Sequence, residues 1–235
     1  MLDFRIVKFM GVIFTPGFNI SNSLKLANNA LELLGERLDG SSSVLPVPQD
    51  APAEIPRVQL VSKDKKWTLT ISLVRTDLIH SPNIEDAEVL SLEEFGTIAS
   101  KFFCGFKEKN DLWVQRLALI TERLSFESEA SYIVTKFCKN ELRQKKAPFS
   151  RVDGFQVHSL KKYNEFGFNI NSWVRFKSVY TKVTESPIPS ILMENDLNTF
   201  ALEEDKDRSF SIEEIGKFFQ QFPNHLEEIV KLYSF

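Results

Sequence analysis

Two short patterns in the sequence pair a carboxylate with a lysine two residues later, as many metal-dependent nucleases do. The residues that could take part are Asp64 with Lys66, Glu204 with Lys206, and Asp50 or Asp196 as a further carboxylate. A magnesium nuclease holds such groups rigidly around the metal, most often on neighbouring strands. Both pairs fall in segments that read as turns or loops. A magnesium nuclease is therefore the third of three functional hypotheses.

The residues that bind calcium, zinc or phosphate in other proteins do not form a site in this sequence. The acidic segment that begins at Asp205 has Phe210 where a calcium loop needs glycine, and Gly216 where it needs a bidentate glutamate. The nine glycines form no phosphate-binding loop. The sequence predicts no cofactor.

Histidines and cysteines are equally scattered. His80, His158 and His225 are isolated from one another, which does not suit a metal centre. Cys104 and Cys138 each fall within a helical apolar pattern, so both are expected to be free, buried thiols. The sequence therefore predicts no metal site and no catalytic residue.

Charge is distributed unevenly along the second half of the chain. Residues 136–162 contain eight basic and two acidic residues, a net charge of +6, whereas residues 185–235 contain eleven acidic and four basic residues, a net charge of −7. The basic segment could contact phosphates or an acidic partner, although solvated helix ends and loops produce the same pattern. The candidate contact residues are Lys136, Lys139, Arg143, Lys145, Lys146, Arg151, Lys161 and Lys162.

Strands and amphipathic helices alternate along the chain, as judged from residue spacing. In the first half, strands are predicted at 4–14, 57–62 and 67–79, and helices at 20–38 (with Gly40 as its C-terminal cap) and 91–107. In the second half, strands are predicted at 113–126, 154–162, 166–182 and 188–200, and helices at 128–144 and 211–232. The Pro-rich segment 40–56 is predicted to be an extended loop.

The two halves share a sequence signature at their last helix. Residues 91–96 (SLEEFG) match residues 211–216 (SIEEIG), and the serine and second glutamate have the spacing of a capping box. Gly96 and Gly216 lie inside these helices, where glycine costs about 1 kcal/mol relative to alanine. We expect both glycines to let a helix pack tightly on the sheet. The sequence thus predicts an internal duplication, with halves 1–110 and 111–235 in one compact unit.

The predicted fold class is α+β, with two related βαββ(β)α halves, antiparallel sheets and helices on one face. The order of features resembles that of a sporadically distributed family of uncharacterised prokaryotic proteins of about this length. The likeness covers most of the chain: an opening Phe-rich strand, a middle hairpin and helix, a strand with Arg116 and Arg123, the segment Met193–Thr199, and a closing helix rich in Phe and Glu. It implies a bacterial accessory gene, in mobile or antiviral-defence neighbourhoods, and no catalytic residues. The repeated halves also resemble a saddle of the TATA-binding-protein type, by fold analogy only.

Composition and hydropathy indicate where the protein acts. Residues 1–5 lack the basic start and apolar core of a signal peptide, and no apolar run approaches the roughly 20 residues of a membrane helix. A cytoplasmic protein of net charge −3 is expected. The leading hypothesis is a non-enzymatic binding or regulatory subunit that acts through protein–protein contacts. The alternative is a nucleic-acid-binding protein that uses the basic segment.

Overall fold

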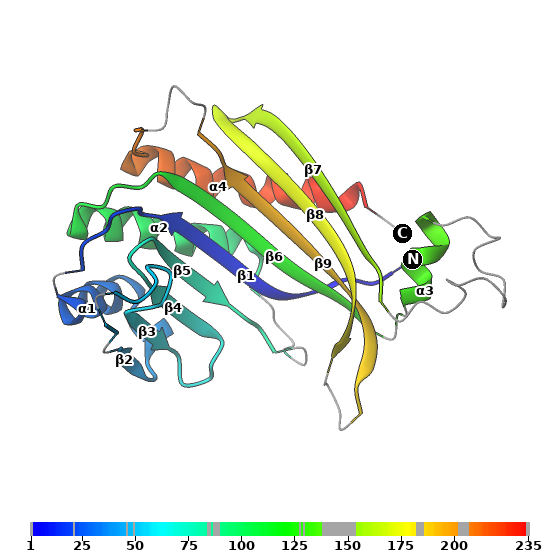
Figure 1. The fold of residues 1–235 in the computed structure, drawn as a ribbon, viewed down its shortest axis with the longest axis horizontal. Coiled ribbons are helices and arrows are strands. Elements are labelled where there is room, and N and C mark those ends of the chain that lie inside the picture. The colour runs from blue at the N-terminus through cyan, green and yellow to red at the C-terminus, as the bar shows by residue number, and fades with distance from the viewer. Residues whose placement is uncertain are drawn as a thin grey trace.

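One large antiparallel sheet organises the chain. The computed structural model describes residues 2–20, 22–45, 47–48, 50–83, 86, 90–126, 128, 130–137, 154–181, 186–201 and 207–233. Within them, the strands run in the order β2-β3-β4-β5-β1-β6-β9-β8-β7, and every neighbouring pair is antiparallel. The helices pack on one face of this sheet (Figure 1). The predicted α+β class is confirmed.

The described strands vary in length, from the three-residue strand β2 to the 14-residue strand β8. The strands are β1 (Arg5–Phe14), β2 (Ser42–Val44), β3 (Val58–Val61), β4 (Trp67–Ile71), β5 (Arg75–His80), β6 (Arg116–Phe126), β7 (Gln156–Glu165), β8 (Phe168–Thr181) and β9 (Ile188–Thr199). The α-helices are α1 (Ser23–Leu34), α2 (Leu92–Asn110), α3 (Ala130–Phe137) and α4 (Ile212–Lys231), and a short 3₁₀ helix, η1 (Gly35–Leu38), follows α1.

The strand order runs against the chain order on both sides of the sheet. From β1 outward the order is β5, β4, β3, β2, and from β6 outward it is β9, β8, β7, so the β1 side has one more strand. β1 and β6, which pair with each other, are the first strands of the two predicted halves. The sheet is continuous across the predicted boundary at residues 110 and 111.

Phenylalanine fills the space between the sheet and the two long helices. Phe102, Phe103 and Phe106 of α2 and the pair Phe218 and Phe219 of α4 are fully buried, together with Phe9 of β1 and other side chains of one apolar cluster. Phe103 and Phe219 stack with ring centroids 4.9 Å apart. The excess of phenylalanine over tyrosine suits this layer, since a fully buried phenyl ring needs no hydrogen-bond partner.

Both predicted capping boxes are present. Ser91 accepts a hydrogen bond from the Glu94 backbone while the Glu94 carboxylate accepts one from the Ser91 backbone. Ser211 and Glu214 make the same exchange at the start of α4. Because each box satisfies free backbone donors, both helices begin where the sequence predicts.

The predicted role of the two helix glycines is wrong in one respect, because they face the partner helix and not the sheet. A Cβ atom at Gly96 would lie 2.4 Å from the Phe219 carbonyl oxygen of α4, and one at Gly216 would lie 3.5 Å from Cys104 Sγ of α2. The close approach of helix to sheet occurs instead at Gly11 of β1, where a Cβ atom would lie 3.0 Å from Phe103. Spacing along a helix identifies a tight contact but not the surface that makes it.

Three further predictions need correction in the first half. The predicted strand 67–79 is two strands, β4 and β5, because Ser72 closes a tight turn with its hydroxyl and backbone bonded to Arg75. The helix cap is Gly35 with φ 56°, not Gly40, which packs against the backbone of residues 61–63. The Pro-rich segment 40–56 contributes the short edge strand β2, before its first proline.

In the second half the turn of the predicted hairpin lies later in the sequence than predicted. β7 continues to Glu165, and the turn is Phe166–Gly167 rather than residues 163–165. Both turn residues have positive φ, 52° and 84°, as a two-residue hairpin turn of type I′ requires. α3 is described to Phe137, and the rest of the predicted helix 128–144, with Cys138, lies outside the described residues.

Candidate functional site

The sheet has a face that the described helices do not cover, and we call it the open face. Strand alternation directs Phe9, Gly11 and Ile13 of β1 toward the helices, and Lys8, Met10, Val12 and Phe14 away from them. The registers extend this division to every long strand. The charged side chains of the open face are Arg5, Lys8, Arg75, Asp77, Arg116, Glu122, Lys162, Arg175, Lys177, Glu194 and Asp196.

A row of polar and aromatic side chains crosses the open face from β5 to β8, and we call it the central row. Its members, in order from β5 to β8, are Arg75, Phe14, Arg116, Asn198, Asp196, Arg175 and Trp173. Each member contacts the next. The row therefore joins side chains from five strands that are distant in the sequence.

Aromatic rings hold the arginines at both ends of the central row. The guanidinium groups of Arg75 and Arg116 lie 5.6 Å and 4.9 Å from the centre of the Phe14 ring. The Arg175 guanidinium lies 4.7 Å from the Trp173 ring. Such contacts orient a guanidinium while leaving its N–H donors available.

Amides and carboxylates form the middle of the central row. Arg116 donates to Asn198 Oδ1 at 2.8 Å, and Asn198 donates to Asp196 Oδ1 at 2.9 Å. Asn171 also donates to Asn198 Oδ1, at 3.2 Å, and its own buried oxygen has no partner within the described part of the chain. Arg175 completes the row through its ion pairs with Glu194 and Asp196.

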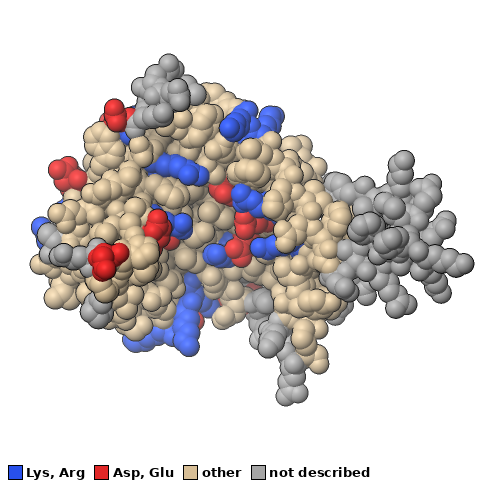
Figure 2. Space-filling model, in the orientation of Figure 1, with Lys and Arg blue, Asp and Glu red and all other residues tan. Residues whose placement is uncertain are grey.

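Each carboxylate on the open face is paired with a cation. Arg75 contacts Asp77 at 2.8 Å, Lys8 contacts Glu122 at 3.0 Å, and Arg175 contacts both Glu194 and Asp196. In Figure 1 the strands lie in front of α2 and α4, and Figure 2 has the same orientation, so it shows basic and acidic groups gathered over the middle of the sheet. The centre of the open face is thus close to neutral but rich in hydrogen-bonding groups.

The structure separates the candidate contact residues that the basic segment suggested. Lys136 is exposed on α3, and Lys161 and Lys162 are adjacent on β7, so they point to opposite faces of the sheet. Lys161 lies over the Tyr163 ring at 5.5 Å, whereas Lys162 lies over the Phe200 ring at 5.6 Å. The other candidates, Lys139, Arg143, Lys145, Lys146 and Arg151, are outside the described residues.

The acidic residues considered for a nuclease do not form a common site in the described part of the chain, and Glu204 and Lys206 lie outside it. Asp64 lies in the turn between β3 and β4, where it accepts hydrogen bonds from Ser62 Oγ and the Lys66 backbone. Lys66 itself pairs with Asp86 at 2.8 Å. Asp196 lies on β9. Three strands lie between β4 and β9, so these two strands are roughly 19 Å apart. Within the described part of the chain, no group of three or more His, Cys, Asp or Glu side chains could hold a metal ion.

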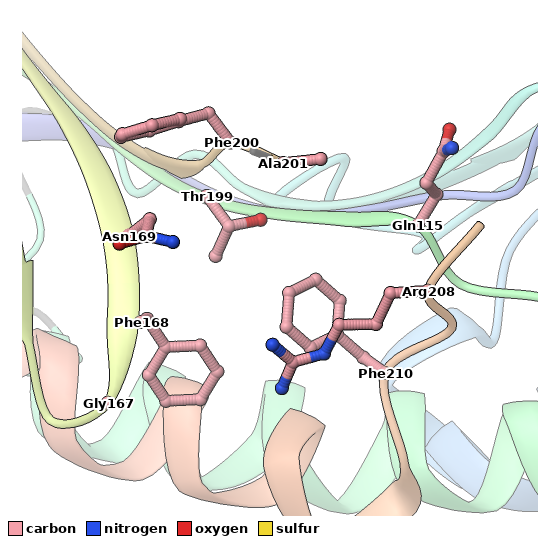
Figure 3. A pocket seen from close by; sticks show the side chains of 9 residues that line it. All are labelled: Gln115, Gly167, Phe168, Asn169, Thr199, Phe200, Ala201, Arg208 and Phe210. Atoms are coloured by element: carbon pink, nitrogen blue, oxygen red, sulfur yellow. The ribbon is translucent and has the colours of Figure 1, made fainter. Parts of the chain in front are cut away.

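A small cleft lies at one end of the sheet, between β8, β9 and the segment that leads into α4. Figure 3 shows Arg208 and Phe210 facing Phe168 and Thr199 across it, with Asn169 alongside. Its enclosed space is about 20 Å³. That space holds about one water molecule, far below the roughly 300 Å³ of a small-molecule site. The cleft therefore does not suit a substrate or an organic cofactor.

A wider, shallow depression lies at the opposite end, beside Trp67. It has a volume of about 470 Å³ and is lined by Glu36, Arg37, Asp39, Ser62, Lys63, Asp64 and Trp67. Lys63 pairs with Asp39 at 3.2 Å across it. Its charged groups are exposed, and Asp39 and Lys63 are paired with each other, so we assign it no ligand.

His80 lies behind that depression, in the layer under the sheet. Its ring is 4.4 Å from the Trp67 ring and 6.1 Å from the Phe9 ring, and its buried Nδ1 atom has no hydrogen-bond partner among the described residues. Burial lowers the pKa of His80 below its ordinary value, and the charge of Lys66 adds to that shift. His80 is thus a neutral aromatic packing residue.

We expect the folded state to lose stability on mild acidification because of His80. The unfolded chain takes up a proton on His80 near its ordinary pKa of about 6.5, while the folded chain resists it to lower pH. The contribution of neutral His80 to the free energy of unfolding is therefore fully present above about pH 6.5. It is lost as the pH falls toward the lowered pKa of the folded state. Urea unfolding at neutral and mildly acidic pH should show this loss, and His80→Phe should reduce it. An unchanged pH dependence of the unfolding free energy in the variant would contradict this account. His225, whose pKa burial also lowers, should still contribute to the loss in the variant.

None of the described helices is long and apolar enough to cross a membrane. No model of a known protein family matches the chain, and no curated protein matches it either.

Proposed function

We propose that this chain is a non-enzymatic binding or regulatory subunit that docks a protein partner on the open face of its sheet. The observation that carries the proposal is the central row, which presents three arginines and a tryptophan on a continuous surface. Arginine and tryptophan are the residues most enriched at the energetic centres of protein interfaces.

The open face is large enough for a stable complex. Nine strands spaced by about 4.8 Å extend over roughly 38 Å, and the long central strands are roughly 33 Å in length. Even a part of that area exceeds the roughly 800 Å² that each partner contributes to an interface of standard size. Small-molecule chemistry has no comparable support, since the cleft of Figure 3 holds about one water.

Charge favours protein over nucleic acid as the partner. Glu122, Glu194 and Asp196 lie in the middle of the open face, on β6 and β9. A phosphate backbone that crossed the sheet would lie against these carboxylates and would have to compete for Lys8 and Arg175, which pair with them. A protein surface with its own mixed charges does not meet that cost. The nucleic-acid alternative thus depends on the basic segment, most of which lies outside the described residues.

The same proposal includes an internal duplication and a saddle-like sheet. The outward strand order from β1 and β6, the paired capping boxes and the antiparallel contact of α2 with α4 support a duplicated scaffold. The resemblance to prokaryotic accessory proteins is the basis for proposing that the partner belongs to a bacterial accessory or defence-associated system.

Trp173→Ala is expected to weaken partner binding by about tenfold or more, because an aromatic anchor at an interface centre contributes about 2 kcal/mol. Trp113→Ala is the matched control, since Trp113 is half exposed but precedes β6 and lies outside the open face. Proteins captured from the native host by the wild type and by both variants should be compared quantitatively. A protein that both variants capture as well as the wild type is not an open-face partner.

Titration with duplex DNA and single-stranded RNA over a range of salt concentrations tests the alternative. The proposal predicts no binding that weakens steeply as salt rises. Tight, salt-sensitive binding that Arg116→Ala and Arg175→Ala abolish would replace the protein partner with a nucleic acid.

A further inference from the structure

β7 forms a long free edge of the sheet. It contains ten residues and pairs with β8, and no other described strand pairs with it. Figure 1 shows it at the margin of the sheet, whereas the opposite margin is the three-residue strand β2. Long edges are the sites at which a sheet can accept another strand.

The hydrogen-bond pattern shows which backbone groups of β7 face outward. The Phe166–Gly167 turn makes Glu165 and Phe168 a hydrogen-bonded pair, and the Ser178 N–H donates to the Phe155 carbonyl at 3.0 Å at the other end. Hydrogen-bonded and non-hydrogen-bonded pairs alternate in an antiparallel ladder. The outward N–H and C=O groups therefore belong to Gln156, His158, Leu160, Lys162 and Asn164.

Contacts on the helix face hold this edge in place. The Tyr163 hydroxyl and His225 Nε2 of α4 are 2.7 Å apart, and the Tyr233 hydroxyl donates to Ser159 Oγ at 3.4 Å. Val157 packs against the apolar cluster around Val174 and Phe176. A strand fixed in this way loses little further freedom when another strand pairs with it.

The basic side chains of β7 favour pairing with an acidic strand over pairing with a basic one. Lys161 and Lys162 lie near its middle with His158 close by, and its one carboxylate, Glu165, is at the turn. Two copies paired antiparallel through their centres would bring these lysines together, which is unfavourable. An acidic strand would instead place carboxylates opposite them.

We propose that the outer edge of β7 accepts an extended, acidic segment of a protein partner as an added antiparallel strand. This inference rests on the proposed function in taking the partner to be a protein, but it concerns the edge and not the central row. Leu160, which is 41% exposed, gives the added strand an apolar side chain to pack against on the open face.

Amide hydrogen exchange on the full chain tests the edge directly. The probe is a peptide of about eight residues that alternates valine with glutamate, and the control peptide alternates valine with lysine. In the free protein the outward amides of residues 158, 160 and 162 should exchange fast and those of residues 157, 159 and 161 slowly. The glutamate peptide should slow the outward amides by roughly tenfold or more, and the lysine peptide should not. Outward amides that are already protected, or protection by neither peptide or by both equally, would overturn the proposal.

Two variants at one position separate the backbone from the side chain. Leu160→Pro removes an outward N–H that β8 does not use, which edge strands tolerate, so the fold should persist by near-ultraviolet circular dichroism. It should lose the effect of the glutamate peptide on residues 158 and 162, whereas Leu160→Ala, which keeps the N–H, should retain it. Equal loss in both variants would indicate side-chain contact alone and would contradict strand addition. The peptide experiment tests only the edge of β7, so it can fail while Trp173→Ala still weakens binding of a protein partner. In the same way, Trp173→Ala can leave partner binding unchanged while the peptide still protects the edge.

Discussion

Gly96→Ala is expected to lower the free energy of unfolding by about 3 kcal/mol, at the upper end of the range for an overpacked core. The added Cβ atom would lie 2.4 Å from the Phe219 carbonyl oxygen and 2.5 Å from Pro223 Cγ. Both are poorly able to move, since one is helix backbone and the other is a ring within the same helix. Pro223 has no N–H, so the Phe219 carbonyl receives no hydrogen bond from residue 223. A shift of this segment of α4 would therefore gain no hydrogen bond to offset the strain.

Gly216→Ala is the matched control for Gly96→Ala. Its Cβ atom would lie 3.5 Å from Cys104 Sγ and 3.6 Å from Ser100 Oγ, which are ordinary contacts. Alanine also favours the helix by about 1 kcal/mol relative to glycine. We expect this variant to be neutral or stabilised in urea unfolding. Equal destabilisation by the two substitutions would contradict the account of the α2–α4 contact.

Arg123→Met is expected to lower the free energy of unfolding by about 2–4 kcal/mol. Arg123 is 3% exposed on the helix face of β6, and burial lowers the pKa of its guanidinium while Glu227 of α4 opposes that shift. It donates to Glu227 Oε1 at 2.6 Å, Thr121 Oγ1 at 2.8 Å and Asn195 Oδ1 at 3.3 Å. Methionine fills the space but leaves the buried Asn195 amide oxygen without its donor. Glu227 is 39% exposed and can be hydrated, which keeps the loss below that of a fully buried pair.

Arg5→Met provides the comparison on a neighbouring strand. Arg5 and Asp3 are separated by 3.8 Å and have side chains 62% and 85% exposed. A pair of this kind contributes little, so the variant should stay within about 0.5 kcal/mol of the wild type. Thermal or urea unfolding of both variants measures the difference. A loss at Arg123 no greater than that at Arg5 would show that the buried network does not stabilise the docking of α4.

Most of the fold could be predicted because its signals are local. The capping boxes at Ser91 and Ser211 identify the starts of both long helices, since cap and helix are only three residues apart. The turn at Ser72 was missed because the apolar alternation of β4 continues into β5 with little interruption. The contact made by Gly96 was misassigned because residue spacing does not say whether a helix faces a sheet or another helix.

The open face could not be predicted as a site, because its members are far apart in the sequence. Arg75, Arg116 and Arg175 come together only through the order β5-β1-β6-β9-β8, which no local pattern encodes. The basic segment, in contrast, is prominent in the sequence because its charges lie close together along the chain. The sequence did contain one sign that the basic segment does not form a single surface. Lys161 and Lys162 are neighbours on a predicted strand, and adjacent residues of a strand point to opposite faces.

Site-specific photo-crosslinking in the native host tests the central claim most directly. A benzophenone amino acid replaces Trp173 on the open face in one strain and the exposed Lys101 of α2 in another. The account predicts a discrete crosslinked protein from position 173 that position 101 does not produce, and that Arg175→Ala diminishes. Crosslinks from position 101 alone, or crosslinks from position 173 that nuclease digestion removes, would contradict a protein partner on the open face.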